Sequence, residues 1–96
     1  LASSYSVLDQ VAKLMSDYPD YSLDIAGHTD SQSDAGLNLN LSKKRAQACY
    51  DYLVKKGVPA SRMSHEGFGE TKPIADNMNA AGRAKNRRVE FNLHLK

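Results

Sequence analysis

The sequence predicts an α/β fold in which helices pack against a sheet. Apolar residues recur with helical spacing over 7–18 and then alternate with polar residues over 21–26. A second helical pattern is followed by two further extended segments, and the last of these, 88–95, alternates without a break. Because helix and strand patterns take turns along the chain, crossovers must connect the strands, and crossovers place helices on the face of a sheet.

The first helix is predicted from Val7 to Tyr18, where apolar side chains at spacings of three and four form one stripe. Pro19 ends this helix, because proline disfavours the helical conformation in the residue before it. From Tyr21 to Ala26 every second side chain is apolar, which predicts a half-buried strand that closes at the following glycine.

The second helix is predicted to begin between Ser33 and Asn40, where Ser33, Asp34 and Asn38 are all suitable N-caps. Its apolar stripe continues to Val54. The helix ends at Gly57, a residue suited to a left-handed C-terminal cap.

The rest of the chain is less regular until its last strand. A short extended piece is expected over 63–67, and a long irregular stretch follows over 67–82, so that an irregular or helical segment precedes the last strand. The clearest strand covers 88–95, because Val89 and each second residue after it are apolar while the residues between them are polar.

Composition limits the classes of protein to consider. The 96 residues are predicted to form one domain, 1–96, with 41% hydrophobic and 25% charged residues, as in an ordinary globular domain. A net charge of +2 does not require a nucleic-acid or membrane partner. The single cysteine, Cys49, excludes an internal disulfide. Because the chain starts on a helix, we expect the native domain to extend upstream by a strand and this chain to be truncated at its N-terminus.

The segment GHTD, at the end of the first predicted strand, is the leading candidate for a binding site, because ligands collect at such strand ends. Its Asp30 lies fifteen residues before Arg45, which shares one helix face with Asn38 and Leu41. A carboxylate opposite a guanidinium is either a structural ion pair or a site for a ligand that carries both an ammonium and a carboxylate group. The residues alone leave both interpretations open.

Other motifs carry less information. The basic run over 83–88 contains no aromatic residue to stack on bases, so nucleic-acid binding is not predicted. The three histidines are too scattered for a metal site, and no nucleophile elbow or carboxylate pair is recognisable. The sequence therefore predicts neither catalysis nor a metal or other cofactor.

Taken together, the motifs resemble the OmpA-like peptidoglycan-binding domain, the C-terminal domain of the OmpA, Pal and MotB proteins. The resemblance covers about Pro19 to Leu93 in order and spacing. It is carried by the following residues: GHTD over 27–30, Asn38, Leu41-Ser42, Arg45-Ala46, Gly57-Val58, Arg62, Gly67-Phe68-Gly69-Glu70, Pro73, Asn77, Gly82-Arg83 and Asn86-Arg87-Arg88-Val89-Glu90.

The resemblance implies a fold and a function. The fold would be a two-layer α/β (α+β) sandwich, with a mixed sheet covered on one face by two main helices, and the family's first strand would be absent from this chain. The slot of that strand would then be an open edge or be filled by a neighbouring chain. The function would be non-catalytic binding of peptidoglycan through the diaminopimelate of its stem peptide.

Such a domain would work in the periplasm and anchor an outer-membrane protein or lipoprotein to the cell wall through an upstream segment. The domain itself would contact neither membrane nor nucleic acid, and its oligomeric state is open. The alternative is a periplasmic protein–protein interaction module that does not bind the wall. A wall-cleaving hydrolase is a remote third hypothesis.

The resemblance also implies roles for single residues. Asp30 matches the family's ammonium-binding aspartate, and Arg45 matches its carboxylate-binding arginine. Asn38 and Leu41 match residues that line the pocket, and Arg87 matches an arginine at its edge.

The GHTD segment and its surroundings also depart from the family pattern. Thr29 belongs to the TD pair, after which family backbone amides donate to the ligand carboxylate. The glycine that usually follows three residues after that pair is Ser33 here, which is expected to alter the loop. The frequent threonine two residues after Asn77 is Asn79.

Overall fold

The structure, a computed structural model, describes residues 2–95 and the side chains from Tyr5 onward. The predicted alternation of helices and strands is confirmed. The elements, in chain order, are α1 (Ala2–Asp17), β1 (Tyr21–His28), α2 (Ala35–Lys55), the 3-10 helix η1 (Ala60–Arg62), β2 (Met63–Gly67), α3 (Ala80–Asn86) and β3 (Arg88–Leu95).

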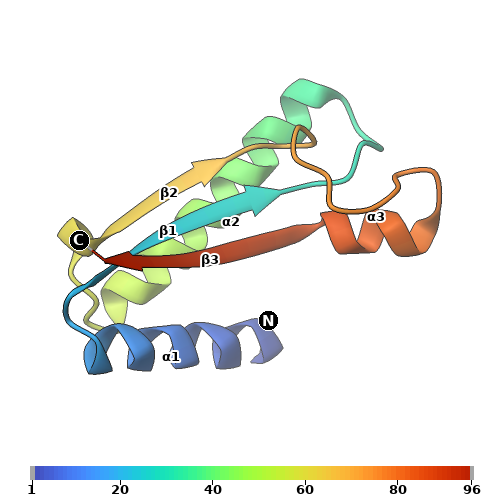
Figure 1. Cartoon of the computed structure of the whole chain (residues 1–96). Coiled ribbons are helices and arrows are strands. Elements are labelled where there is room, and N and C mark those ends of the chain that lie inside the picture. The colour runs from blue at the N-terminus through green and yellow to red at the C-terminus, as the bar shows by residue number, and fades with distance from the viewer. Residues whose placement is uncertain (1, 96) are drawn as a thin grey trace.

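The three strands form one mixed sheet with the order β2-β1-β3 (Figure 1). The central strand β1 runs parallel to β2 and antiparallel to β3. The connection from β1 to β2 passes through α2, as a parallel pair requires. Residues far apart in sequence therefore meet across β1: Ala26 is paired with Glu66 on one side and with Glu90 on the other.

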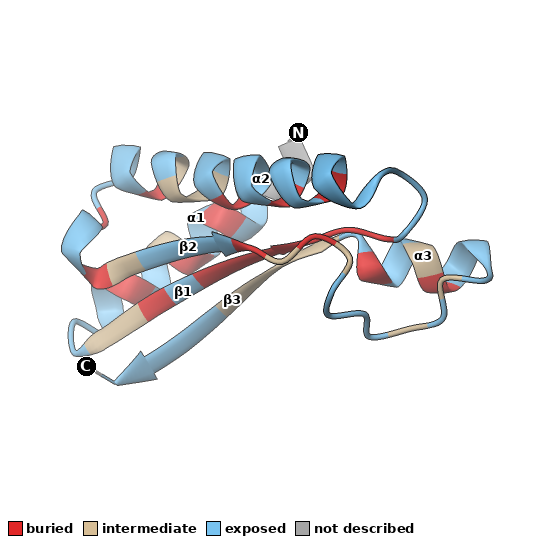
Figure 2. Ribbon diagram, turned by 90° about the horizontal axis from the view of Figure 1, so that it is seen from above, coloured by how far each residue is buried: buried red, intermediate tan, exposed pale blue. Residues whose placement is uncertain are grey.

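Both long helices cover the same face of the sheet, as the resemblance implied. The apolar side chains of β1 on that face, Leu23 and Ile25, are almost completely buried. They pack with residues of both helices, and Figure 2 shows the buried positions gathered between helices and sheet. The core cluster consists of Leu8, Val11, Met15, Leu23, Ile25, Ala46, Leu53 and Val58.

Close approach between α2 and the sheet depends on glycine. A Cβ built on Gly27 would collide with the backbone carbonyl of Ser42, and one built on Gly67 would collide with the backbone of Lys43. The absence of side chains at these two positions lets α2 lie directly against the ends of β1 and β2.

A buried arginine connects α1 to the sheet at the end where β1 begins. The guanidinium of Arg62 donates to the carbonyls of Met15 at 2.9 Å, Tyr18 at 2.8 Å and Tyr21 at 2.7 Å. Two of these carbonyls lie in and just after the last turn of α1, where the helix itself offers no donors. Arg62 therefore fixes the turn between α1 and β1.

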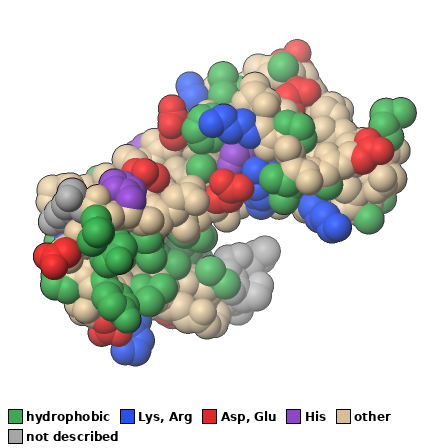
Figure 3. Space-filling model, viewed as in Figure 1, with side chains coloured by type: hydrophobic (Ala, Val, Ile, Leu, Met, Phe, Trp, Pro, Cys, Tyr) green, Lys and Arg blue, Asp and Glu red, His purple; other side chains and the backbone are tan. Residues whose placement is uncertain are grey.

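The outer edge of β3 has no strand beside it within the described residues. Leu93 and Leu95, near the end of this edge strand, are 43% and 65% exposed. Leu93 lines a groove with Leu14, Tyr18 and Tyr21. Figure 3 shows hydrophobic side chains gathered on this part of the surface, at the lower left.

Several details differ from the prediction. The first helix begins at Ala2, and α3 begins at Ala80, within the stretch predicted to be irregular. The helix α3 has no apolar period to reveal it; its start is set by Asn79, whose side chain accepts from the amide of Gly82 at 2.7 Å. Asn79, which departs from the family pattern, thus serves as an N-cap. Val54, placed in the apolar stripe of α2, is 41% exposed because that side of the helix faces away from the sheet.

Within residues 2–95, no helix combines the length and the apolar character needed to cross a membrane.

Candidate functional site

The GHTD segment ends β1 and enters a loop that is buried despite its polarity. Thr29 and Asp30 are only 4% and 7% exposed. The amide of Thr29 donates to the carbonyl of Gly69 at 2.8 Å, and the amide of Gly69 donates to the hydroxyl of Ser42 at 2.8 Å. Gly69 can make this turn because its φ of 58° lies in the left-handed region. The loop is therefore held between α2 and the segment after β2.

The carboxylate of Asp30 is the charged centre of this loop. Its Oδ1 accepts from the amide of Gln32 at 3.0 Å, and its Oδ2 accepts from the guanidinium of Arg87 at 2.6 Å. The Gln32 amide and then Arg87 hold the pKa of the Asp30 carboxyl below its usual range. Asp30 is thus a fixed negative charge at neutral pH.

Asn38 lies behind the loop. It is 3% exposed, and its side-chain amide donates to the carbonyls of Asp30 at 3.2 Å and Ser33 at 3.1 Å and to Glu70 Oε1 at 3.4 Å. Asn38 therefore braces the loop from α2. Ser33 does not need to be a glycine here, because its φ is not positive. The N-cap of α2 is Asp34, which accepts from the amides of Gly36 and Leu37.

Arg45 and Leu41 lie on the exposed side of α2. Arg45 lines a groove of about 640 Å³ between α1, α2 and the start of β3, whose lining also includes Val89. The ion-pair interpretation of Asp30 and Arg45 is not supported, because the ion pair that Asp30 makes is with Arg87. Sequence spacing did not identify this partner, since 57 residues separate the two.

Arg87 is placed by a second buried asparagine. Asn86 is completely buried; its Oδ1 accepts from the amides of Ile74 and Ala75, and its Nδ2 donates to the Ala75 carbonyl and to Asn77. These bonds fold the stretch after β2 against α3. The next residue, Arg87, then caps α3 and points its guanidinium to Asp30.

His28, the histidine of the GHTD segment, lies on the opposite face of the sheet. It is 2% exposed and stacks on Phe68 with a 5.4 Å separation of ring centroids. Its Nε2 is 3.4 Å from Glu90 Oε1, but neither ring nitrogen makes a hydrogen bond. Burial lowers the pKa of His28, and the nearby Arg88 adds to this effect, so the ring is neutral at neutral pH.

Across the described residues, no group of three or more His, Cys, Asp or Glu side chains is arranged to hold a metal ion.

The sheet is mixed and carries two helices on one face. At the end of its central strand, a hydrogen-bonded loop presents a carboxylate and an arginine. These features define a binding module of the OmpA-like type. Residues 1–87 match the model of the OmpA family, and the chain belongs to this family.

Relatives of known name and structure agree with this assignment. The chain is 46% identical to outer membrane porin F of Pseudomonas fluorescens over 95% of its own length, which is 28% of the porin. It is 41% identical to the peptidoglycan-binding protein ArfA of Mycobacterium tuberculosis over 95% of its length and 28% of that protein. The structure superimposes on the peptidoglycan-associated lipoprotein of Burkholderia pseudomallei with a TM-score of 0.91 and 30% identity, covering 98% of this chain and 80% of that one. The chain thus spans about a quarter of the length of these two sequence relatives.

Proposed function

We propose that this domain binds peptidoglycan without catalysis, at the diaminopimelate of the stem peptide. The observation that carries the proposal is the Asp30 loop, which presents a fixed carboxylate beside Arg87 at the end of β1. The names of two relatives, a peptidoglycan-binding protein and a peptidoglycan-associated lipoprotein, support the choice of ligand. We further propose that the domain lies in the periplasm and holds an outer-membrane protein or lipoprotein to the wall.

The ligand would carry an ammonium and a carboxylate group on one carbon atom. The site therefore needs a negative charge for the first group and a positive charge for the second. In this proposal the ammonium group binds Asp30, whose carboxylate oxygens have lone pairs beyond those used by Gln32 and Arg87. The ligand carboxylate binds Arg87, which is 46% exposed and has N–H donors beyond the one that Asp30 accepts. In this proposal Arg45, on the exposed side of α2, binds the same carboxylate with its guanidinium group.

The remaining predicted residues shape the site. Asn38 holds the loop in place through its three donated hydrogen bonds. Thr29 fixes the turn by donating its hydroxyl hydrogen to the Asp30 carbonyl at 2.8 Å. Leu41, which is 41% exposed, offers an apolar contact to the methylene groups of the ligand.

The test is a titration of diaminopimelate together with a pull-down on purified peptidoglycan sacculi. Asp30→Ala and Arg45→Ala should each weaken binding about ten- to a hundredfold, as expected for loss of one charge-assisted contact. Arg45→Lys should also bind poorly, because an ammonium keeps the charge and loses the two-pronged geometry. The matched control is Lys44→Ala, one residue away on the exposed side of α2, which should bind normally.

Undiminished binding by both alanine variants would place the site elsewhere. A wild-type domain that remains in solution with sacculi would instead favour a protein–protein interaction module. Circular dichroism of each variant separates loss of a contact from loss of folding.

A further inference from the structure

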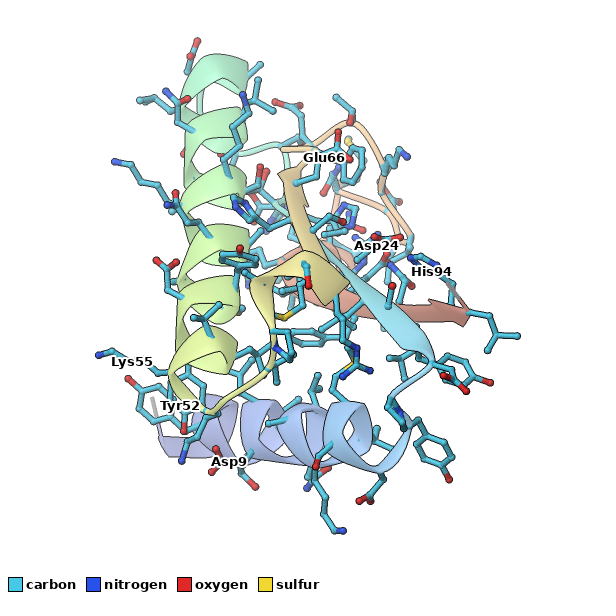
Figure 4. The ribbon with its side chains drawn as sticks, turned by 90° about the vertical axis from the view of Figure 1, so that its left-hand side faces the viewer. Asp9, Asp24, Tyr52, Lys55, Glu66 and His94 are labelled. Carbon is cyan, nitrogen blue, oxygen red and sulfur yellow. The ribbon has the colours of Figure 1, made fainter. Side chains whose placement is uncertain are left out.

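The face of the sheet opposite the helices carries a polar groove of about 370 Å³ that the proposed wall-binding site does not use. Figure 4 shows Asp24 and His94 on this side of the sheet, turned away from α2. The groove is lined mainly by the side chains of Asp24, Ala26, His28, Glu66, Lys72 and Glu90.

The strand register places two carboxylates on either side of a small residue. Ala26 of β1 is paired with Glu66 of β2 and with Glu90 of β3, so the three side chains form one row across the sheet. Because neighbouring strands lie about 4.8 Å apart, the two glutamates start about 10 Å from one another. This spacing suits a ligand with a positive charge at each end that lies across Ala26.

The groove also contains a buried polar side chain without a partner. His28 lies two residues after Ala26 on the same face of β1, and both of its ring nitrogens lack hydrogen bonds. A buried polar atom that stays unpaired costs free energy, and a ligand that donates a hydrogen bond would recover part of this cost.

Two cations, Lys72 in the lining of the groove and Arg88 beside it, contact other groups of the protein. The Lys72 ammonium lies 4.1 Å from the centre of the Phe68 ring, at the His28 end of the groove. Arg88 binds Glu90 Oε2 at 2.8 Å and donates to backbone carbonyls of Asn86 and Lys72. Glu66, in contrast, has no ion pair within the described residues.

Asp24 adds a third carboxylate at the other end of the groove. It accepts from the Ser64 hydroxyl at 2.5 Å and lies 3.1 Å from His94 Nε2. The lining of the groove thus holds three carboxylates, those of Asp24, Glu66 and Glu90, and one ammonium group, that of Lys72, so its balance of charge is negative.

We propose that this groove binds a small alkyl diamine. One ammonium group binds Glu66, the other binds Glu90 Oε1 within reach of His28, and the alkyl chain crosses Ala26, whose methyl side chain leaves room for it. Because this ligand has no carboxylate and lies on the opposite face of the sheet, its binding is independent of the diaminopimelate site.

The test is an NMR titration of the domain with 1,4-diaminobutane, with butylamine as the monovalent control. The diamine should shift backbone amide signals of β1, β2 and β3 around Ala26 and bind at least about tenfold more tightly than butylamine, because it gains a second charge-assisted contact. Glu66→Gln should weaken diamine binding about tenfold, since it removes the charge and keeps the shape. Asp20→Asn, at an exposed carboxylate outside the groove, is the matched control and should have no effect.

A second variant fills the groove, and its binding to sacculi reports whether the domain is still folded. Ala26→Leu should fill the space above the Ala26 methyl group and abolish diamine binding, while binding to sacculi, which uses the Asp30 loop after β1, should stay unchanged. Equal binding of butylamine and the diamine, or undiminished diamine binding by Glu66→Gln, would overturn the proposal. It would also be overturned if a lysine-containing peptide shifted these signals and the diamine did not, because the surface would then recognise a protein.

Discussion

The two ends of this domain are held together by different forces. At the end where α1 turns into β1, apolar side chains of both helices and of β1 fill a closed layer. At the end of the GHTD loop, the fixed parts are polar: Asn38, Ser42 and Asn86 are each buried and each hydrogen-bonded to backbone groups of loops. Apolar packing depends mainly on volume, whereas a hydrogen-bonded loop depends on the position of particular atoms. A site that must present Asp30 in one orientation is therefore built on the second kind of contact.

The comparison predicts that the largest loss of stability comes from the apolar layer. Leu53 is completely buried against the core cluster, and Leu53→Ala should lower the free energy of unfolding by about 3 kcal/mol, because it leaves a cavity. Urea denaturation measures this value. Val54→Ala, next to it and exposed, should change stability by less than about 0.5 kcal/mol. Binding to sacculi should survive Leu53→Ala wherever the variant is folded; a folded variant that no longer binds would show that the two ends are coupled.

At the GHTD end, Asn86→Ala should lower the free energy of unfolding by about 2 kcal/mol, because the amides of Ile74 and Ala75 lose the acceptor that the completely buried Asn86 side chain provides. Hydrogen exchange should reveal faster exchange at these two amides, with little change in the strands. Peptidoglycan binding should weaken as well, since Asn86 positions the neighbouring Arg87. Asn86→Asp retains the acceptor but loses the two donated hydrogen bonds, so it should protect both amides better than Asn86→Ala and less well than wild type. Equal protection in wild type and Asn86→Ala would contradict the assigned role.

Arg62 is a buried polar residue at the end of the domain that is otherwise held by apolar packing. Its substitution therefore tests whether the two ends are independent of one another. Arg62→Lys should lower stability by about 1.5 kcal/mol, because one ammonium cannot reach the three carbonyls that the guanidinium binds. Its effect on ligand binding should be nil, as it lies at the far end of β1 from Asp30. Thermal unfolding and diaminopimelate titration of the same sample check both statements, and a binding defect in the folded variant would refute the separation of the two ends.

The smallest expected effect is a dependence on pH that differs between two histidines of the same strand pair. Burial lowers the pKa of His28, so the unfolded chain takes up its proton first as the pH falls from the ordinary value of 6.5. The stability associated with neutral His28 is thus present above pH 6.5 and declines as the pH falls toward its lowered pKa.

His94 should show the opposite sign. A hydrogen bond to the Leu95 carbonyl, and then Asp24, raise the pKa of His94, so its contribution is present below pH 6.5 and disappears as the pH rises through the raised pKa. Because His94 is exposed, its effect should be the weaker of the two. Urea midpoints measured from pH 5 to 8 should show a slope that flattens in His28→Gln and steepens in His94→Gln. An unchanged slope in His28→Gln would argue against the buried, neutral ring.

From the sequence alone, we could predict the order of the two long helices and the three strands and the face of β1 that packs into the core. The family could also be predicted from its motifs. Local periodicity carries this information, because the apolar stripe of α1 and the alternation in β3 follow from short-range geometry that any helix or strand imposes. It also indicated that Asp30 lies at a strand end, where a ligand can be bound.

Only the tertiary structure decided which side chains meet there. Asp30 pairs with Arg87 rather than Arg45, Asn38 braces the loop from behind, and α3 forms without an apolar period. The Asp30–Arg87 pair and α3 depend on the path of the chain after β2, which the buried side-chain amide of Asn86 directs. A side chain that binds the backbone of a distant loop leaves no periodic pattern in the sequence, so its partner becomes visible only when the loop is in place.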